Sequence, residues 1–258
     1  MKIDPGFLLD AYSHPGAVRD YSRAVDRVGL WKSEAEFFGR HLLREGRLLD
    51  LGCGAGRTTF GLYRRGCRNI VGADLSPALI RLARDHAARR HLGLRFRVAD
   101  ACKLPFASGS FDGCLFSFNG LMTIPRRARR IAALREVRRV LAPGGRFVFT
   151  THERGDDARW RKERVLWNAG RQDPRLHEFG DEVVEELGRP TFVHVPHRRE
   201  ILDCLDAARL EWLEDAYPGL TRESKAVRDF VSFQCRFWAA RRKFQGSRSC
   251  RRRVPLYI

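Results

Sequence analysis

Three aspartates and a run of alternating glycines are the residues of this chain best suited to hold a small ligand. The stretch LLDLGCGAGRTTF, residues 48–60, places Asp50 two positions before the first of three glycines. Asp74 and Asp100 end the next two short apolar segments. In an open α/β sheet, ligands bind at the edge where the carboxyl ends of neighbouring parallel strands meet. The spacing therefore predicts three carboxylates around one ligand.

The pattern from residue 47 onward predicts the sheet that would position these acids. Short apolar segments alternate with amphipathic helical patterns, which is typical of a parallel sheet covered by helices. The predicted strands are 47–52, 69–75, 94–100, 111–119 and 146–152, with predicted helices at 57–65, 76–91 and 126–141. After a helix at 198–210, two strands at 211–217 and 229–241 follow without a helix between them, so they must run antiparallel if they pair.

The glycine spacing discriminates between kinds of nucleotide site. A phosphate-binding P-loop needs a lysine after its last glycine, and no lysine lies near this turn. The dinucleotide pattern G-x-G-x-x-G would need a glycine where Arg57 stands, although Asp74 supplies the acid expected after the second strand. A tight strand-to-helix turn without any ligand is a third reading of the same glycines.

Asp50 favours a ligand of another kind. A carboxylate directly before the glycines would repel a pyrophosphate, but it would attract a ligand that carries an ammonium and a sulfonium. The two later acids suit a ribose diol and an adenine amine, because both ligand groups donate hydrogen bonds. Together these positions predict S-adenosylmethionine as the cofactor and S-adenosylhomocysteine as its product.

Four stretches of the chain resemble the successive motifs of class I S-adenosylmethionine-dependent methyltransferases, small-molecule-type branch. They are LLDLGCGAGRTT, VGADLSPALIRLAR, RVADACKLPFASGSFDGCLFSFN and EVRRVLAPGGRFVFTTH. The resemblance covers residues 45–152 by motif and 197–240 by pattern. It implies an α/β fold with a doubly wound, mostly parallel seven-stranded sheet whose last strand is antiparallel, with N-terminal helices and a cap insertion after strand five.

The resemblance also implies cofactor-binding roles for the matching positions. Four of them would hold the methionine end of the cofactor: Asp50, Gly52, Cys53 and Gly54. Glycine is needed there because a Cβ would collide with the cofactor. Asp74 would accept hydrogen bonds from both ribose hydroxyls, and Leu75 would pack on the adenine. Asp100 would accept the adenine amine, with Ala101 beside the ring.

The methyl side of the site is implied less sharply. Phe118 or Asn119, after the fourth strand, would face the transferred methyl group. An aromatic residue near the N-terminus would close over the cofactor, and Tyr21 is the first candidate, followed by Tyr12 and Trp31. Packing between helices explains these aromatic residues equally well.

His152 is the best-placed titratable group for proton transfer, because it directly follows the fifth strand. Methyl transfer needs alignment of nucleophile, methyl group and sulfur, and a general base only if the nucleophile must lose a proton. His152 and Asn119 are thus the predicted catalytic residues, and His194 and His197 are the next candidate bases. A structural role competes with each histidine. No zinc-ligand spacing links the histidines or the seven cysteines, so no metal site is predicted.

The formal net charge of +18 predicts affinity for anions. The charge is densest in IPRRARRIAALREVRRVL, residues 124–141, where an apolar helical stripe makes a solvated arginine face the simplest interpretation.

The predicted partner is a small-molecule substrate, anionic or aromatic. Alternatives are methylation of RNA, a peptide or a protein, a NAD-type oxidoreductase, and a non-catalytic S-adenosylmethionine-binding module. Nucleic acid is not favoured, because the chain has FSFNGLMTIP where amino-group methyltransferases carry N/D-P-P-Y/F.

The chain divides by composition into five predicted segments. They are a helical lid at 1–46, the S-adenosylmethionine-binding core at 47–152, a substrate cap at 153–196, the second half of the sheet at 197–243 and a disordered basic tail at 244–258. In the first, Ser33 is the predicted N-cap of a helix. No apolar run long enough for a membrane span and no signal peptide is apparent, and the cysteine pattern indicates a reducing cytoplasm. We expect a monomer or a homodimer.

Overall fold

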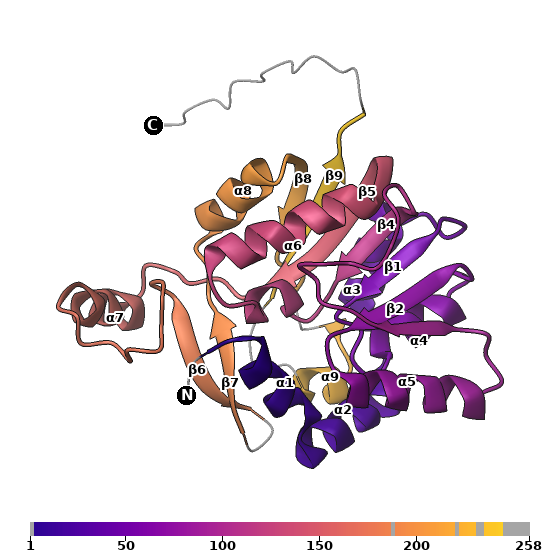
Figure 1. Cartoon of the computed structure of the whole chain (residues 1–258), viewed down its shortest axis with the longest axis horizontal. Coiled ribbons are helices and arrows are strands. Elements are labelled where there is room, and N and C mark those ends of the chain that lie inside the picture. Colours follow the sequence, from indigo (N-terminus) through magenta and orange to yellow (C-terminus); the bar gives the residue numbers. More distant parts are fainter. Residues whose placement is uncertain (1–2, 187–188, 220–221, 231–234, 245–258) are drawn as a thin grey trace.

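A central seven-stranded sheet organises the computed structural model, which describes residues 3–186, 189–219, 222–230 and 235–244 (Figure 1). The strand order is β3-β2-β1-β4-β5-β9-β8, and neighbouring pairs from β3 to β5 are parallel, whereas β9 runs antiparallel to both β5 and β8. The predicted fold class is confirmed. The strands are β1 Leu48–Leu51, β2 Ile70–Asp74, β3 Arg95–Val98, β4 Phe111–Phe116, β5 Leu141–Thr151, β8 Leu210–Ala216 and β9 Arg236–Arg242.

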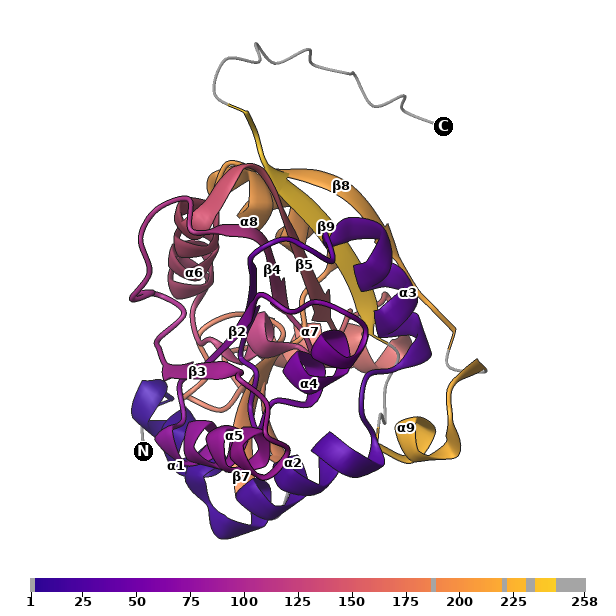
Figure 2. The same ribbon diagram turned by 90° about the vertical axis from the view of Figure 1, so that its right-hand side faces the viewer.

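Helices cover both faces of this sheet, as Figure 2 shows for α6 and α8 on one side and α3 on the other. Because successive side chains of a strand point to opposite faces of the sheet, each strand contributes residues to the apolar layer on either face. Phe147 and Phe149 of β5 stack with Trp238 beneath α6 and α8, whereas Val148 and Phe237 face α3. The covering helices are α3 Lys32–His41, α4 Arg57–Arg64, α5 Pro77–Arg89, α6 Arg127–Val140 and α8 Arg198–Ala207.

The remaining elements gather at the carboxyl edge of the sheet. The insertion after β5 forms a helix and a two-stranded hairpin, both of which extend beyond the sheet in Figure 1. Helix α1 packs against this hairpin, because Ile3, Phe7 and Leu8 surround the buried Phe192. The N-terminal segment and the insertion therefore form one apolar cluster. The elements are α1 Pro5–Ser13, α2 Pro15–Arg27, the 3₁₀ helix η1 Gly120–Thr123, α7 Ala158–Asn168, β6 Asp181–Glu186, β7 Arg189–His194 and α9 Lys225–Phe230.

Three local predictions were wrong. Ser33 does not cap α3: the N-cap is Trp31, whose backbone N–H donates to Glu34 at 3.1 Å, and Ser33 lies inside the first turn. A helix, α9, does separate β8 from β9, and residues 229–230 end that helix instead of starting a strand. The fifth strand begins at Leu141 and not at residue 146, so the Pro-Gly-Gly stretch at 143–145 lies within β5, where the pairing with β4 is irregular.

The predicted basic tail falls outside the described residues except for Phe244. The division into lid, core and cap remains a prediction. Among the described residues, no helix is long and apolar enough to cross a bilayer, and the cytoplasmic location and the oligomeric state also remain predictions.

Candidate functional site

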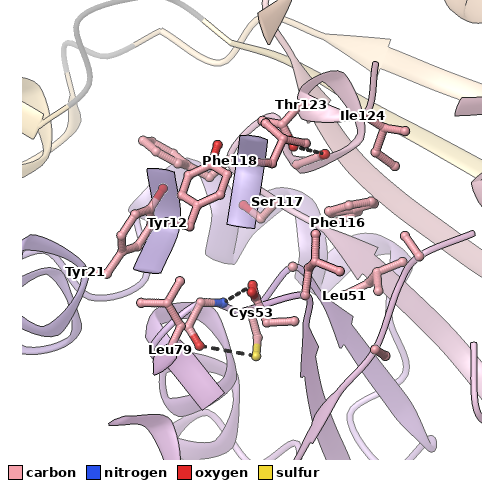
Figure 3. A pocket seen from close by; sticks show the side chains of 18 of the residues that line it. Tyr12, Tyr21, Leu51, Cys53, Leu79, Phe116, Ser117, Phe118, Thr123 and Ile124 are labelled. Atoms are coloured by element: carbon pink, nitrogen blue, oxygen red, sulfur yellow. Dashed lines mark hydrogen bonds between the residues drawn. The ribbon is translucent and has the colours of Figure 1, made fainter. Parts of the chain in front are cut away.

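A pocket opens at the carboxyl edge of the sheet, above β1, β2 and β4 and beneath helices α1 and α2 (Figure 3). The strand ends and the loops that follow them form its floor, and side chains of the N-terminal helices form its roof. Most of the predicted cofactor-binding positions line it together. They are Tyr21, Gly52, Cys53, Gly54, Asp74, Leu75, Asp100, Ala101 and Phe118.

The glycine turn after β1 adopts a backbone that disfavours other residues. Gly52 and Gly54 have φ values of +65° and +54°, in the left-handed region where a Cβ is costly. A Cβ on Gly52 would lie 2.5 Å from the ring of Phe116, so this position also needs glycine for space. A Cβ on Gly54 would lie 3.3 Å from the ring of Tyr21, which places that ring directly against the turn.

Asp74 joins the end of β2 to this turn. Its Oδ2 accepts the backbone N–H of Gly54 at 2.9 Å, and its Oδ1 accepts the N–H of Ser76 at 2.8 Å. Burial raises the pKa of Asp74, while these backbone donors act to lower it. Each carboxylate oxygen has a second lone pair, so both oxygens can still accept a hydroxyl from a ligand in the pocket.

Asp50 lies beneath the turn and does not line the pocket. Its side chain is fully buried, and its Oδ2 accepts the hydroxyls of Thr58 at 2.6 Å and Thr59 at 2.5 Å. Within the described part of the chain its Oδ1 has no hydrogen-bond partner. Burial raises the pKa of Asp50 to about 6, while the hydroxyls of Thr58 and Thr59 and the charge of Arg57 act to lower it. In its ionised form the group places negative charge beneath the glycine turn.

The opposite end of the pocket holds an ion pair that the sequence did not indicate. Asp100 accepts the backbone N–H of Cys102 at 2.8 Å and lies 3.3 Å from a guanidinium nitrogen of Arg129, in α6. Arg129 lines the pocket together with Leu75 and Ala101, which are the positions expected around an adenine ring. The predicted adenine acceptor thus has a cation beside it.

A buried charged network forms the wall near the ends of β1 and β4. Arg57 occupies the third slot of the glycine pattern, and its guanidinium makes two hydrogen bonds to Glu34, at 2.6 and 2.7 Å. Ser117 donates its hydroxyl to the same carboxylate at 2.6 Å. The guanidinium also lies 5.0 Å from the ring centre of Trp31 and 5.9 Å from that of Phe118. Glu34 is not among the predicted site residues, since nothing in the sequence signals its contact with Arg57, 23 positions away.

Asn119 and His152 meet each other and lie outside the pocket wall. The Asn119 amide nitrogen lies 2.8 Å from Nε2 of His152, and its backbone N–H donates to Thr150 at 2.9 Å. Burial lowers the pKa of His152, which favours a neutral ring whose Nε2 accepts from the amide. Phe118 and Asn119 have φ values of +52° and +60°, so the backbone of both residues is strained. The bonds of Asn119 to His152 and Thr150 hold this backbone in place, and Phe118 lines the pocket.

The other histidine candidates have structural partners. His194 is buried between Asp181 and Glu200, with its Nδ1 and Nε2 at 2.8 and 3.1 Å from their carboxylates. His197 is the N-cap of α8 and accepts a backbone N–H. His194 and Asp181 also lie near Glu178, in a grouping of metal-ligand type. Each member already bonds a protein group, and Glu178 pairs with an arginine of α6, so these contacts account for the cluster without a metal.

The aromatic roof includes two of the three predicted residues. Tyr12 and Tyr21 both line the pocket, and their rings make an edge contact with centroids 6.0 Å apart (Figure 3). Trp31 is buried behind the pocket wall, against Phe118. The roof side chains are thus Tyr12 and Tyr21, together with apolar residues of α1 and α2.

Comparison with known proteins agrees with this geometry. Residues 48–145 match the family described as "Methyltransferase domain". A demethylmenaquinone methyltransferase of Thermus thermophilus is 42% identical over 103 residues, which are 40% of this chain and 45% of the relative. A tocopherol O-methyltransferase of Arabidopsis thaliana is 35% identical over 107 residues, covering 41% of this chain and 30% of that protein. The matched part therefore spans less than half of each of these relatives.

Solved structures show the same fold over most of the chain. A S-adenosylmethionine-dependent methyltransferase from Methanosarcina mazei superposes with a TM-score of 0.66 at 22% identity, covering 81% of this chain and 98% of that one. A geranyl diphosphate C-methyltransferase from Streptomyces coelicolor A3(2), solved with Mg²⁺, geranyl diphosphate and S-adenosylhomocysteine, gives 0.58 at 20% identity over 91% and 88% of the two chains. The chain therefore shares the fold of these solved structures over most of its length, and its residues 48–145 match the methyltransferase-domain family.

Proposed function

We propose that this protein transfers a methyl group from S-adenosylmethionine to a small molecule. The observation that carries the proposal is the pocket itself, in which the glycine turn, Asp74 and Asp100 meet at one edge of a class I sheet. The residues present fit the cofactor, because the glycines leave the floor free of Cβ atoms and a buried carboxylate lies under the turn. When bound, S-adenosylmethionine supplies a methyl group on a positively charged sulfur.

In this proposal each part of the pocket holds one part of the cofactor. Asp74 accepts the ribose hydroxyls with the lone pairs left by its two backbone bonds. Asp100 accepts the adenine amine while Leu75 and Ala101 pack against the ring. The glycine turn with Cys53 faces the methionine end, and Asp50 beneath it stabilises positive charge there.

The protein's part in the reaction is alignment and exclusion of water. The pocket would hold the acceptor's lone pair in line with the methyl group that the bound cofactor supplies. Phe118 would shape the methyl side, held by the bonds of Asn119 to His152 and Thr150. We propose Asn119 and His152 as positioning residues for Phe118. A base role for His152 remains the alternative for an acceptor that must lose a proton.

The pocket walls favour a small, largely apolar acceptor. Above the cofactor region, Leu8, Tyr12, Phe118 and Ile124 present apolar or aromatic surface. The relatives named above act, by their names, on demethylmenaquinone, a tocopherol and geranyl diphosphate, all of which carry long apolar groups. A macromolecular acceptor would have to pass the roof formed by α1 and α2, and it is the less favoured candidate.

The proposal is tested by incubating the purified chain with S-adenosylmethionine labelled in its methyl group. The acceptors are a panel of phenols, quinols and apolar acids, and both S-adenosylhomocysteine and labelled product are measured by mass spectrometry. We expect transfer to at least one member in stoichiometric balance with S-adenosylhomocysteine. Release of S-adenosylhomocysteine only with added RNA or protein would contradict a small-molecule acceptor. Asp85→Asn, which changes an exposed acid of α5, is the matched control for pocket variants.

A further inference from the structure

A second cavity adjoins the cofactor pocket and has a basic lining. The two share Pro5, Pro125 and Arg129 as lining residues, so they adjoin at these residues. Three segments distant in sequence form the second cavity: the start of α1, the approach to α6 and the insertion before β6. Its remaining lining residues are Ile3, Asp4, Arg126, Pro174, Arg175 and His177.

Among the charged groups of this cavity, Arg126 is the one whose charge is not balanced locally. Arg129 pairs with Asp100, and Arg175 pairs with Asp173 through its Nε and a terminal nitrogen. Asp4, the acid of the lining, caps α1 by accepting the N–H of Phe7. Within the described residues, neither the guanidinium of Arg126 nor the ring of His177 forms an ion pair or a hydrogen bond.

The backbone holds Arg126 in an unusual conformation at this place. Its φ of +66° and ψ of 127° lie outside the regions that residues with a side chain normally adopt. Pro125 precedes it and α6 begins directly after it, where Glu178 accepts the N–H of Arg127. A strained residue persists when its surroundings fix it, and such residues cluster at binding sites.

The arginine-rich run 124–141 is therefore only partly a solvated face. Arg130 is 3% exposed and forms an ion pair with Glu178 of the insertion, and Arg129 lines both cavities. Arg130 thus faces inward, toward the insertion, whereas residues 126–128 at the start of α6 are exposed. This placement gives part of the positive charge of the chain a specific location beside the pocket.

We propose that this second cavity binds an acidic group of the methyl acceptor. The acceptor would be a mostly apolar small molecule whose carboxylate or phosphate lies at Arg126 and His177, while its other end enters the apolar part of the cofactor pocket beneath α1. A guanidinium forms two parallel hydrogen bonds to either acid, and apolar side chains such as Ile3, Pro125 and Pro174 complete the walls. This inference rests on the proposed function for its substrate role.

The test measures anion binding directly, with and without S-adenosylhomocysteine. The probes are octanoate, its neutral analogue octanamide, and inorganic phosphate, and calorimetric titration gives the affinity of each chain for each probe. In the parent and in Arg171→Met, the Nε–H resonance of Arg126 is also followed by NMR. We compare the parent chain with Arg126→Met and with Arg171→Met, which removes the same charge from an exposed position of the insertion that does not line the cavity. Thermal unfolding of each variant checks that it is folded.

We expect octanoate to shift the Arg126 resonance and octanamide not to shift it. Binding should weaken by about tenfold or more in Arg126→Met and stay unchanged in Arg171→Met. Binding of phosphate but not octanoate would assign the site to phosphorylated acceptors, and the reverse would assign it to carboxylates. Equal weakening in both variants, or no binding of either anion, would overturn the proposal.

The failure of this inference is distinguishable from failure of the proposed function. S-adenosylhomocysteine that binds normally to a chain with no affinity for either anion would overturn the acidic-group site alone. A chain that does not bind S-adenosylhomocysteine would contradict the proposed function and with it the assignment of the anion to a methyl acceptor.

Discussion

The carboxylate of Asp74 accepts the backbone N–H of Gly54 at 2.9 Å, so the end of β2 is bonded to the glycine turn after β1. One residue thereby fixes the turn and presents two oxygens to the pocket. The second of these oxygens is oriented by the N–H of Ser76, at the start of α5. Cofactor affinity and the shape of the turn should therefore depend on the same side chain.

Replacing Asp74 by alanine should weaken binding of S-adenosylhomocysteine by about 1.5–3 kcal/mol, because hydrogen bonds to a charged group are lost. Titration calorimetry measures the change. Asp85→Asn, in an exposed part of α5, should bind as the parent does. An affinity unchanged by Asp74→Ala would exclude the ribose role.

Cofactor binding should protect the roof of the pocket from hydrogen exchange. Tyr12 and Tyr21 line the pocket from α1 and α2, so a ligand beneath them adds contacts that hold these helices closed. Mass spectrometry should show slower exchange in residues 5–27 when S-adenosylhomocysteine is added, and a smaller effect in Tyr21→Ala. Protection confined to the glycine turn would show that these helices are not a lid.

The Glu34–Arg57 pair should be strongly coupled. Both side chains are buried, and removing one partner leaves the other charge without compensation. Glu34→Gln should lower the free energy of unfolding by about 3–5 kcal/mol in urea titrations. Combining it with Arg57→Met should cost less than the sum of the two single changes. Strict additivity would mean that the pair contributes no interaction of its own.

Acid should weaken the attachment of the insertion through Glu200. Its pKa is held at about 2, below the ordinary 4.5, by hydrogen bonds from His194 and Arg154 that outweigh burial. Between about pH 4.5 and pH 2, Glu200 binds a proton in the unfolded chain but not in the folded chain. The stabilisation is therefore complete above about pH 4.5 and is lost as the pH falls toward 2.

The measurement for this prediction is the difference in unfolding free energy between the parent and Glu200→Gln at pH 6, 4.5 and 3. We expect the difference to change little between pH 6 and pH 4.5 and to be clearly smaller at pH 3. Glu45→Gln, at an exposed site, should show no such trend. A difference that stays constant with pH would remove Glu200 from the acid response.

Features that are local along the chain could be predicted from the sequence. The strands around the pocket follow from apolar segments of the right length, and the turn follows from the spacing of Gly52 and Gly54. Asp74 and Asp100 lie one strand apart because parallel strands end at a common edge. The helix at 225–230 was not predicted, since its six residues are too short to show a clear period.

The features that remained hidden depend on contacts between distant segments. Glu34 meets Arg57 only because α3 packs beside the glycine turn, and a buried ion pair leaves no spacing signal. His152 and Asn119 face each other across the ends of β4 and β5. The ring of His152, the predicted base, therefore contacts Asn119 and does not line the pocket. The inward side of the basic run likewise depends on the insertion that covers it.

The central claim is most directly tested by calorimetric titration of the parent chain with S-adenosylhomocysteine and, separately, with NAD. The account predicts one S-adenosylhomocysteine bound per chain and no detectable heat of binding from NAD. Saturable binding of NAD by a chain that does not bind S-adenosylhomocysteine would contradict it.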